Sequence, residues 1–159
     1  MLRGWIDAVR RNHALEHATV AVFLARYGPT RMAGRASGDG FFILGDVPDD
    51  ALRTSVEEGL RRLQSGEASL AVSPLCGTNI AVSGLLAATA ATAVLSSGST
   101  RSRFGNAVTA SMLAVIVAQP LGRLIQQHVT TRPDLDHVEF VDIRTLLPGV
   151  RKVRTRVTR

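Results

Sequence analysis

The sequence has a single cysteine, Cys76, and few aromatic residues, which make up 4% of its 159 residues. One cysteine cannot form an intramolecular disulfide, so the chain gives no sign of an oxidising compartment. Because aromatic rings are scarce, the 45% of residues that are hydrophobic are mainly Ala, Val and Leu, which favour closely packed helices over a large soluble core. The length suits one compact domain.

Lysine is also scarce, because Lys152 is the only lysine among 19 basic residues, and the net charge is +6. Arginine stays charged at any pH, and its guanidinium group binds two phosphate oxygens at once. Nucleic acid and anionic lipid are therefore the partner classes that this composition could favour. The chain lacks a helix-turn-helix pattern and an aromatic stacking pattern, and we therefore expect no specific nucleic-acid binding. A dense basic end predicts either attraction to anionic headgroups or a solvated tail. Its residues are Arg151, Lys152, Arg154, Arg156 and Arg159.

Two long stretches, Ala68 to Thr100 and Phe104 to Gly122, contain no charged residue. Nineteen helical residues reach about 28 Å, close to the roughly 30 Å thickness of the hydrocarbon core. We expect two transmembrane helices in a lipid bilayer, joined by a tight loop at Ser99 to Arg103. The alternative is an Ala-rich helical hairpin buried in a soluble domain, which Asn106 and Gln119 make credible.

The arginines around these stretches favour one orientation. Four lie within about 20 residues of the outer ends, against two in the loop, so the main domain should be cytoplasmic. They are Arg61, Arg62, Arg123 and Arg132 at the outer ends, and Arg101 and Arg103 in the loop. We expect a multi-pass protein of the bacterial inner (cytoplasmic) membrane.

The chain before these stretches predicts a small sheet with helices. Trp5 to Tyr27 reads as a helix that Gly28-Pro29 ends. Two short segments, Arg31 to Ala36 and Phe41 to Leu44, flank a Gly-rich turn and predict a β-hairpin.

A second helix should begin near Pro48, whose missing N–H is not needed in a first turn. Its expected buried stripe is Leu52, Val56, Leu60 and Leu63. Strands are expected at Ser69 to Ser73, His137 to Ile143 and Val150 to Val157. The predicted fold class is α/β, with a small mixed sheet, two packed helices and an inserted two-helix transmembrane hairpin. The expected divisions are an α/β domain at 1–77, the hairpin at 78–127, and C-terminal strands with the basic tail at 128–159.

The most specific motif is H-x-x-E-H, formed by His13, Glu16 and His17. One helical turn brings both imidazoles and the carboxylate onto one face. Two histidines at i and i+4 can each offer a nitrogen to one zinc ion. The alternative is that these side chains satisfy buried polar contacts, or cap a partner loop such as the one that holds Thr78 and Asn79.

This motif resembles the inverzincin metallopeptidases of the pitrilysin and insulinase type. The resemblance implies that His13 and His17 bind zinc and that Glu16 is the general base. In that family a glutamate on a later helix completes the site. Glu57 and Glu58 lie on a comparable helix here, but both point away from its apolar face and are doubtful ligands.

Cys76 is the better candidate for a third ligand, because it lies in a Pro- and Gly-rich turn and a thiolate binds zinc strongly. A lone cysteine is also often an inert buried hydrophobe. His128 and His137 are the alternates, each more typical of a surface or structural histidine.

The whole chain is similar to a family of small, uncharacterised bacterial membrane proteins marked by N-H-A-L-E-H-A-T and S-P-x-C-G-T-N blocks. Here these blocks are Asn12 to Thr19 and Ser73 to Asn79. The similarity implies the architecture described above and no particular activity.

Together these patterns predict a membrane-anchored, zinc-dependent hydrolase of peptidase type, with its site at the membrane interface and a peptide or lipid-linked substrate. Whether the chain is an enzyme stays open. The alternative is a non-enzymatic membrane scaffold, or a structural or sensory metal-binding module. Nucleic-acid binding through the arginine surplus is a weaker third possibility.

Overall fold

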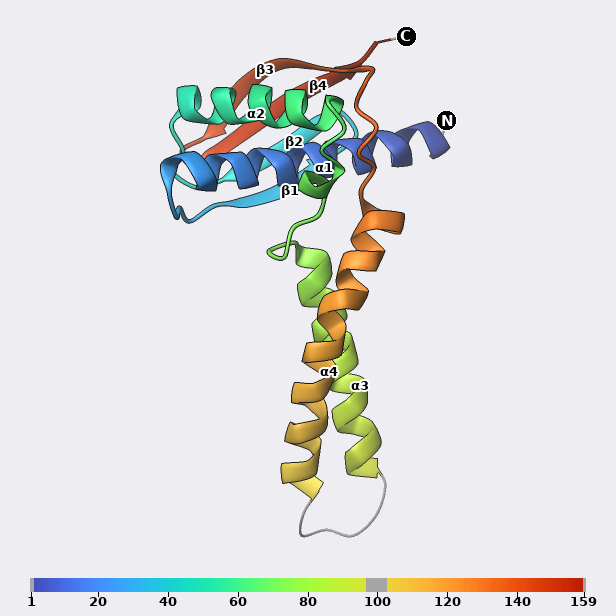
Figure 1. Ribbon diagram of the computed structural model, residues 1–159. Coiled ribbons are helices and arrows are strands. Elements are labelled where there is room, and N and C mark those ends of the chain that lie inside the picture. The colour runs from blue at the N-terminus through green and yellow to red at the C-terminus, as the bar shows by residue number, and fades with distance from the viewer. Residues whose placement is uncertain (1, 97–102, 159) are drawn as a thin grey trace. The chain divides into compact units, whose positions relative to one another are not determined.

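A computed structural model describes residues 2–96 and 103–158 of the chain. Its elements are α1 (Leu2–Tyr27), β1 (Ala33–Ser37), β2 (Gly40–Leu44), α2 (Asp49–Gln64), the 3-10 helix η1 (Ala68–Ala71), α3 (Gly77–Ser96), α4 (Arg103–Ile125), the π-helix η2 (Gln126–Thr130), β3 (Val138–Leu147) and β4 (Val150–Val157). They form two compact units (Figure 1). The first consists of Met1–Ser73 and Gln127–Arg159, and the second is Pro74–Gln126.

The first unit is a four-stranded sheet with the order β1-β2-β4-β3, in which every neighbouring pair is antiparallel. Helices α1 and α2 pack on the same side of this sheet (Figure 1). The hydrophobic core lies between these two helices and the sheet. Its fully buried members include Leu15 and Ala18 of α1, Phe41 and Ile43 of β2, Leu52 and Val56 of α2, and Val153 of β4. The core therefore fixes α1, the helix that carries the H-x-x-E-H motif.

The expected α/β class is confirmed, as are the first helix, the β-hairpin and the second helix with its buried stripe. The sheet is antiparallel rather than mixed, because both local strand connections are hairpins and β4 returns antiparallel to β2. The strand expected at Ser69 to Ser73 is wrong. Those residues begin in η1, where the N–H of Val72 donates to the carbonyl of Ser69 and Ala71 is buried. A short apolar run can form a helical turn as readily as a strand.

The basic C-terminal residues form a strand of the sheet rather than a tail. The four that lie in β4 each have an acidic partner. The pairs are Arg151 with Asp49, Lys152 with Asp39, Arg154 with Asp142, and Arg156 with Glu139. Arg159 lies outside the described residues. Residues 151–156 therefore belong to the sheet, and their ion pairs link β4 to acidic residues elsewhere in the α/β unit.

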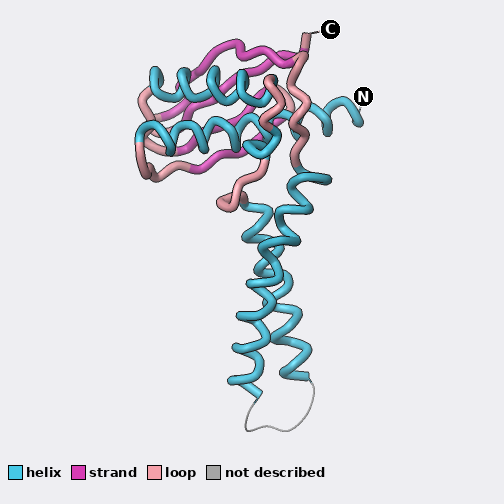
Figure 2. The backbone as a smooth tube through the Cα atoms, in the orientation of Figure 1, coloured by secondary structure: helices cyan, strands magenta, loops and turns pink. Residues whose placement is uncertain are grey.

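The second unit is a helical hairpin in which α3 and α4 run side by side (Figure 2). Near its base, Gln126 Nε2 donates to Asn79 Oδ1 at 3.0 Å, and Asn79 Nδ2 donates to the carbonyl of Pro74 at 3.1 Å. These hydrogen bonds need a glycine at position 122, because a Cβ there would lie 2.0 Å from Asn79 Oδ1. Of the loop expected at Ser99 to Arg103, residues 99–102 lie outside the described residues, and Arg103 begins α4.

Both helices of this unit are long and apolar enough to cross a membrane. Gly77–Ser96 and Arg103–Thr130 each have a mean hydropathy of 1.6, and only 6% and 11% of their apolar windows are buried. This burial is far below that of a typical core helix, which favours the transmembrane interpretation over a hairpin buried inside a soluble domain.

Candidate metal centre

His13 and His17 lie one turn apart on α1, as the sequence predicts. Their ring centroids are 4.4 Å apart, with an angle of 62° between the ring planes. The helix holds them firmly because Ala14, Leu15 and Ala18, which alternate with them, are fully buried in the core. The i and i+4 spacing thus brings two imidazoles together on an anchored stretch of helix.

Backbone carbonyls orient both rings. His17 Nδ1 lies 2.8 Å from the carbonyl oxygen of Ala71 in η1, and His13 Nδ1 lies 2.9 Å from that of Thr130 in η2. Since a carbonyl oxygen can only accept a hydrogen bond, each Nδ1 carries the proton and donates it. The second ring nitrogen, Nε2, is then the atom of each ring that could bind a metal. Metal-binding histidines are commonly held in this way.

His17 Nε2 is the most informative atom of the site. The residue is only 4% exposed, and this nitrogen is buried without a hydrogen-bond partner among the described residues. An unsatisfied buried polar group costs about 1–3 kcal/mol. Such groups are uncommon in folded proteins and need an explanation. A bound cation would provide the missing partner.

Cys76 immediately precedes α3 and its backbone and side chain both engage the start of that helix. The N–H of Thr78 lies 3.4 Å from Cys76 Sγ, and the N–H of Asn79 donates to the Cys76 carbonyl at 2.9 Å.

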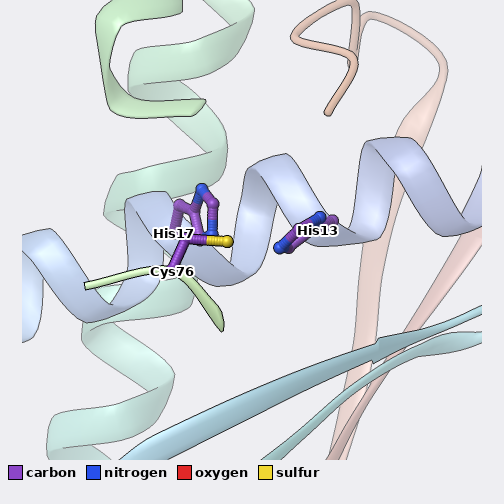
Figure 3. A group of neighbouring side chains, drawn as sticks. All are labelled: His13, His17 and Cys76. Atoms are coloured by element: carbon purple, nitrogen blue, oxygen red, sulfur yellow. The ribbon is translucent and has the colours of Figure 1, made fainter. Parts of the chain in front are cut away.

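The chain also tethers Cys76 near the histidines, since Cys76 follows Ala71, the hydrogen-bond partner of His17, by only five residues. In the structure one ring nitrogen from each histidine and the Sγ of Cys76 lie within 4.8 Å of one another (Figure 3). Tetrahedral zinc with ordinary Zn–N and Zn–S bonds brings such atoms to about 3.3–3.6 Å. This cluster could therefore hold a metal ion after a contraction of about an ångström.

Glu16 is buried, but it does not belong to this group of potential ligands within the described residues. Its side chain lies against Gly34 of β1, where an added Cβ would be 2.1 Å from Glu16 Oε1. The absence of a side chain at Gly34 is what allows this approach. The role of Glu16 as a general base stays a prediction.

Asn12 has a structural role that the sequence patterns do not reveal. Its Nδ2 donates to the carbonyl of Ser37 at 2.8 Å, and its Oδ1 accepts from the Thr155 hydroxyl at 2.7 Å. Asn12 thus joins α1 to β1 and β4. A buried asparagine next to the motif was the available signal, but its partners lie 25 and 143 residues away.

The alternates do not join the metal cluster in the described part of the chain. His128 lines a cavity of about 300 Å³ together with residues of η1 and the segment after η2. The carbonyl of His137 accepts a hydrogen bond from the N–H of Thr158 at 2.7 Å. Glu58 pairs with Arg61, whose hydrogen bonds lower the pKa of that carboxyl.

A charged clamp holds the segment that orients His13. Arg10 donates to the carbonyls of His128 and Thr131, at 2.9 and 3.3 Å. Arg11 and Arg132 both pair with Asp134. Burial acts to raise the pKa of Asp134, but the hydrogen bonds from Arg11 and Arg132 lower it overall. This clamp keeps the Thr130 carbonyl beside α1.

Comparison with known proteins identifies an uncharacterised family. The chain is 39% identical over 135 residues to an uncharacterised protein of Picosynechococcus sp., an alignment that covers 77% of this chain and 65% of the relative. The chain thus spans just under two thirds of that relative's length. No solved structure matches the chain. The expected similarity to an uncharacterised family is confirmed, whereas the inverzincin resemblance stays a hypothesis. Since residues 8–143 match the DUF6391 family, described as a domain of unknown function, the chain belongs to that family.

Proposed function

We propose that this protein is a membrane-anchored zinc protein in which His13, His17 and Cys76 bind the metal, and that it is a hydrolase. The observation that carries the proposal is the buried, unpartnered Nε2 of His17. It lies in a ring whose Nδ1 is already committed to Ala71, and within reach of a second imidazole and a thiol.

The donor set fits zinc, which takes imidazole nitrogen and thiolate sulfur in tetrahedral sites. Three protein ligands leave one position open, the arrangement typical of catalytic rather than structural zinc. When bound, zinc would act as a Lewis acid toward a carbonyl substrate. The residues of this chain would orient the ligands through the carbonyls of Ala71 and Thr130. Glu16 would accept a proton at its carboxylate after turning away from Gly34.

Two features support placement at a membrane. The helices α3 and α4 have the length and hydropathy of transmembrane segments, and they are largely exposed. Cys76 directly precedes α3, so a site that includes Cys76 would lie near the interface if α3 crosses the bilayer. We propose an inner-membrane protein with its α/β unit in the cytoplasm and a peptide or lipid-linked substrate.

Metal analysis of the purified full-length protein tests the site. We expect about one zinc ion per wild-type chain, and loss of the metal in His17→Ala and in Cys76→Ser. His128→Ala is the matched control and should keep it. In the cobalt-substituted protein, the thiolate-to-cobalt absorption should disappear in Cys76→Ser and persist in His128→Ala. Zinc that is absent from the wild type, or equal in all variants, would refute the metal site.

A Glu16→Gln variant separates catalysis from structure. If Glu16 is the general base, the variant keeps its zinc and its thermal stability and loses hydrolysis of model peptides by about 10²–10⁴-fold. A second candidate function, a structural or sensory metal module, is favoured by the contact of Glu16 with Gly34. In that case the wild type hydrolyses nothing, and the substitution lowers the unfolding temperature instead.

A further inference from the structure

The first turns of α1 carry an exposed apolar stripe that the candidate metal centre does not use. Leu2, Trp5 and Ile6 are 71%, 59% and 43% exposed. Their spacing of i, i+3 and i+4 places them on one side of the helix. Further along, α1 is buried from Ala14 to Thr19. One helix therefore combines an anchored middle with an uncovered apolar beginning.

Trp5 is exposed but held in position. A Cβ at Gly38, in the turn between β1 and β2, would lie 2.7 Å from Trp5 Nε1 and 2.8 Å from its Cδ1. The indole thus lies over the backbone of that turn, at a residue where no side chain intervenes. The stripe is part of the α/β unit, and its exposure does not come from fraying of the helix end.

The charges around the stripe differ in their pairing. Asp7 is paired with Arg10 and Arg132. Arg3 is exposed and has no ion pair within residues 2–96 and 103–158. Aliphatic side chains with a tryptophan and a neighbouring unpaired cation are the composition of helices that lie in a membrane interface. Tryptophan itself is enriched at this depth.

We propose that Leu2, Trp5 and Ile6 insert at the boundary between headgroups and acyl chains of the bilayer that α3 and α4 cross. This inference rests on the proposed membrane insertion of the hairpin. The hairpin would keep the α/β unit close to lipid at all times, so the bilayer is the apolar phase always within reach. Three side chains are also too few for a protein partner, since a standard interface buries about 800 Å² on each side.

The experiment uses Trp5 as its own probe, because it is the only tryptophan in the chain. The full-length protein is reconstituted into phosphatidylcholine–phosphatidylglycerol vesicles, and tryptophan emission is recorded with spin-labelled lipids that quench at shallow or deep positions. We expect blue-shifted emission, stronger quenching by the shallow label, and protection from aqueous iodide. A Leu2→Ser Ile6→Ser variant should lose all three effects. Leu44→Ser Leu146→Ser, with two exposed leucines on the sheet, is the control and should keep them.

Flotation of the same vesicles separates the two proposals. Protein that fails to float with lipid refutes the membrane hairpin. If the protein floats but Trp5 emission is quenched by iodide and by neither spin-labelled lipid, only the interfacial stripe is refuted. Protection from iodide that vanishes when the protein is diluted in lipid would assign the stripe to a second copy of the chain, and would also overturn the proposal.

Discussion

Lys152 lies buried in the middle of β4, where an ammonium group needs compensation for its lost hydration. Its Nζ is 2.7 Å from Asp39 Oδ1, donates to the Ser37 hydroxyl, and lies 4.2 Å from the centre of the Phe42 ring. Asp39 lies in the turn of the first hairpin, and Ser37 and Phe42 lie in the strands beside it, so these contacts join the hairpin to β4. At the scale of single residues, the contacts of one buried charge thus stabilise the sheet in addition to the hydrophobic core.

This ion pair predicts a pH dependence of stability. The hydrogen bond from Lys152 lowers the pKa of Asp39 below its ordinary 3.8. A carboxyl with a depressed folded-state pKa stabilises the fold above its unfolded pKa, and this contribution is lost as the pH falls through the folded value. We expect Asp39→Asn to reduce the free energy of unfolding at pH 7 by about 1 kcal/mol or less, because Asp39 is largely exposed.

Urea unfolding of the detergent-solubilised chain, followed by circular dichroism, measures this effect. The difference from wild type should be constant above pH 3.8 and shrink below it. Asp46→Asn is the control, since Asp46 is exposed and has no ion pair among the described residues. A difference for Asp39→Asn that grows toward low pH would contradict the assignment.

The sequence predicted the placement of the two motif histidines better than it predicted their surroundings. Helical periodicity alone places His13 and His17 on one face, which the structure confirms. The carbonyls that orient them belong to Ala71 and Thr130, which are 54 and 117 residues away from their partners. No local pattern encodes such backbone contacts. The close fit of Glu16 to Gly34 also depends on how α1 crosses the sheet.

At the scale of elements, Gly59 decides how closely α1 and α2 pack. A Cβ there would lie 3.1 Å from the carbonyl carbon of Ala18 and 3.2 Å from the backbone nitrogen of Thr19. The obstructing atoms belong to the backbone, so a larger residue must push the two helices apart. The absence of a side chain at Gly59 thereby sets the spacing between α1 and α2.

We therefore expect Gly59→Val to lower the free energy of unfolding by about 1–3 kcal/mol, the usual cost of overpacking. Glu57→Val, on the exposed side of the same helix, should stay within about 0.5 kcal/mol of wild type. Thermal and urea unfolding of both variants make the comparison. Equal destabilisation of the two would contradict the role of the helix contact. Helix propensity alone favours valine over glycine at position 59 and disfavours valine against glutamate at position 57.

Elements were predictable where the pattern was long or the turn was specific. The β-hairpin was found because its glycines mark the turn, and α2 was found because four apolar residues repeat with helical spacing. The segment at Ser69 to Ser73 failed because five residues carry no decisive period. Its true form, η1, is set by contact with α1.

At the scale of the whole molecule, the sheet joins chain segments from both sides of the hairpin. β2 precedes α3 and α4, whereas its neighbour β4 follows them. Two strands that pair must lie on the same side of a bilayer. If α3 crosses the bilayer after β2, then α4 must cross back before β4. If the hairpin is inserted, both halves of the α/β unit lie on the same side.

Thiol labelling tests this topology in a Cys76→Ser background. We expect single cysteines at Arg26, on α1, and at Arg144, on β3, to react with a membrane-impermeant maleimide in inverted inner-membrane vesicles and to be protected in intact cells. Both positions are exposed on the α/β unit. Labelling of the two positions from opposite faces would contradict the paired crossing, and labelling of both only in intact cells would reverse the orientation.

The strand order also fixes a sequence of events during synthesis. Among the described elements β4 is synthesised last, yet it occupies an interior place in the sheet, between β2 and β3. Until it arrives, β2 keeps an unpaired edge, and such edges invite association with other chains. If the hairpin is inserted into a bilayer, α3 and α4 are therefore synthesised while the sheet still lacks β3 and β4. The sheet can close only after both helices of the hairpin have been made.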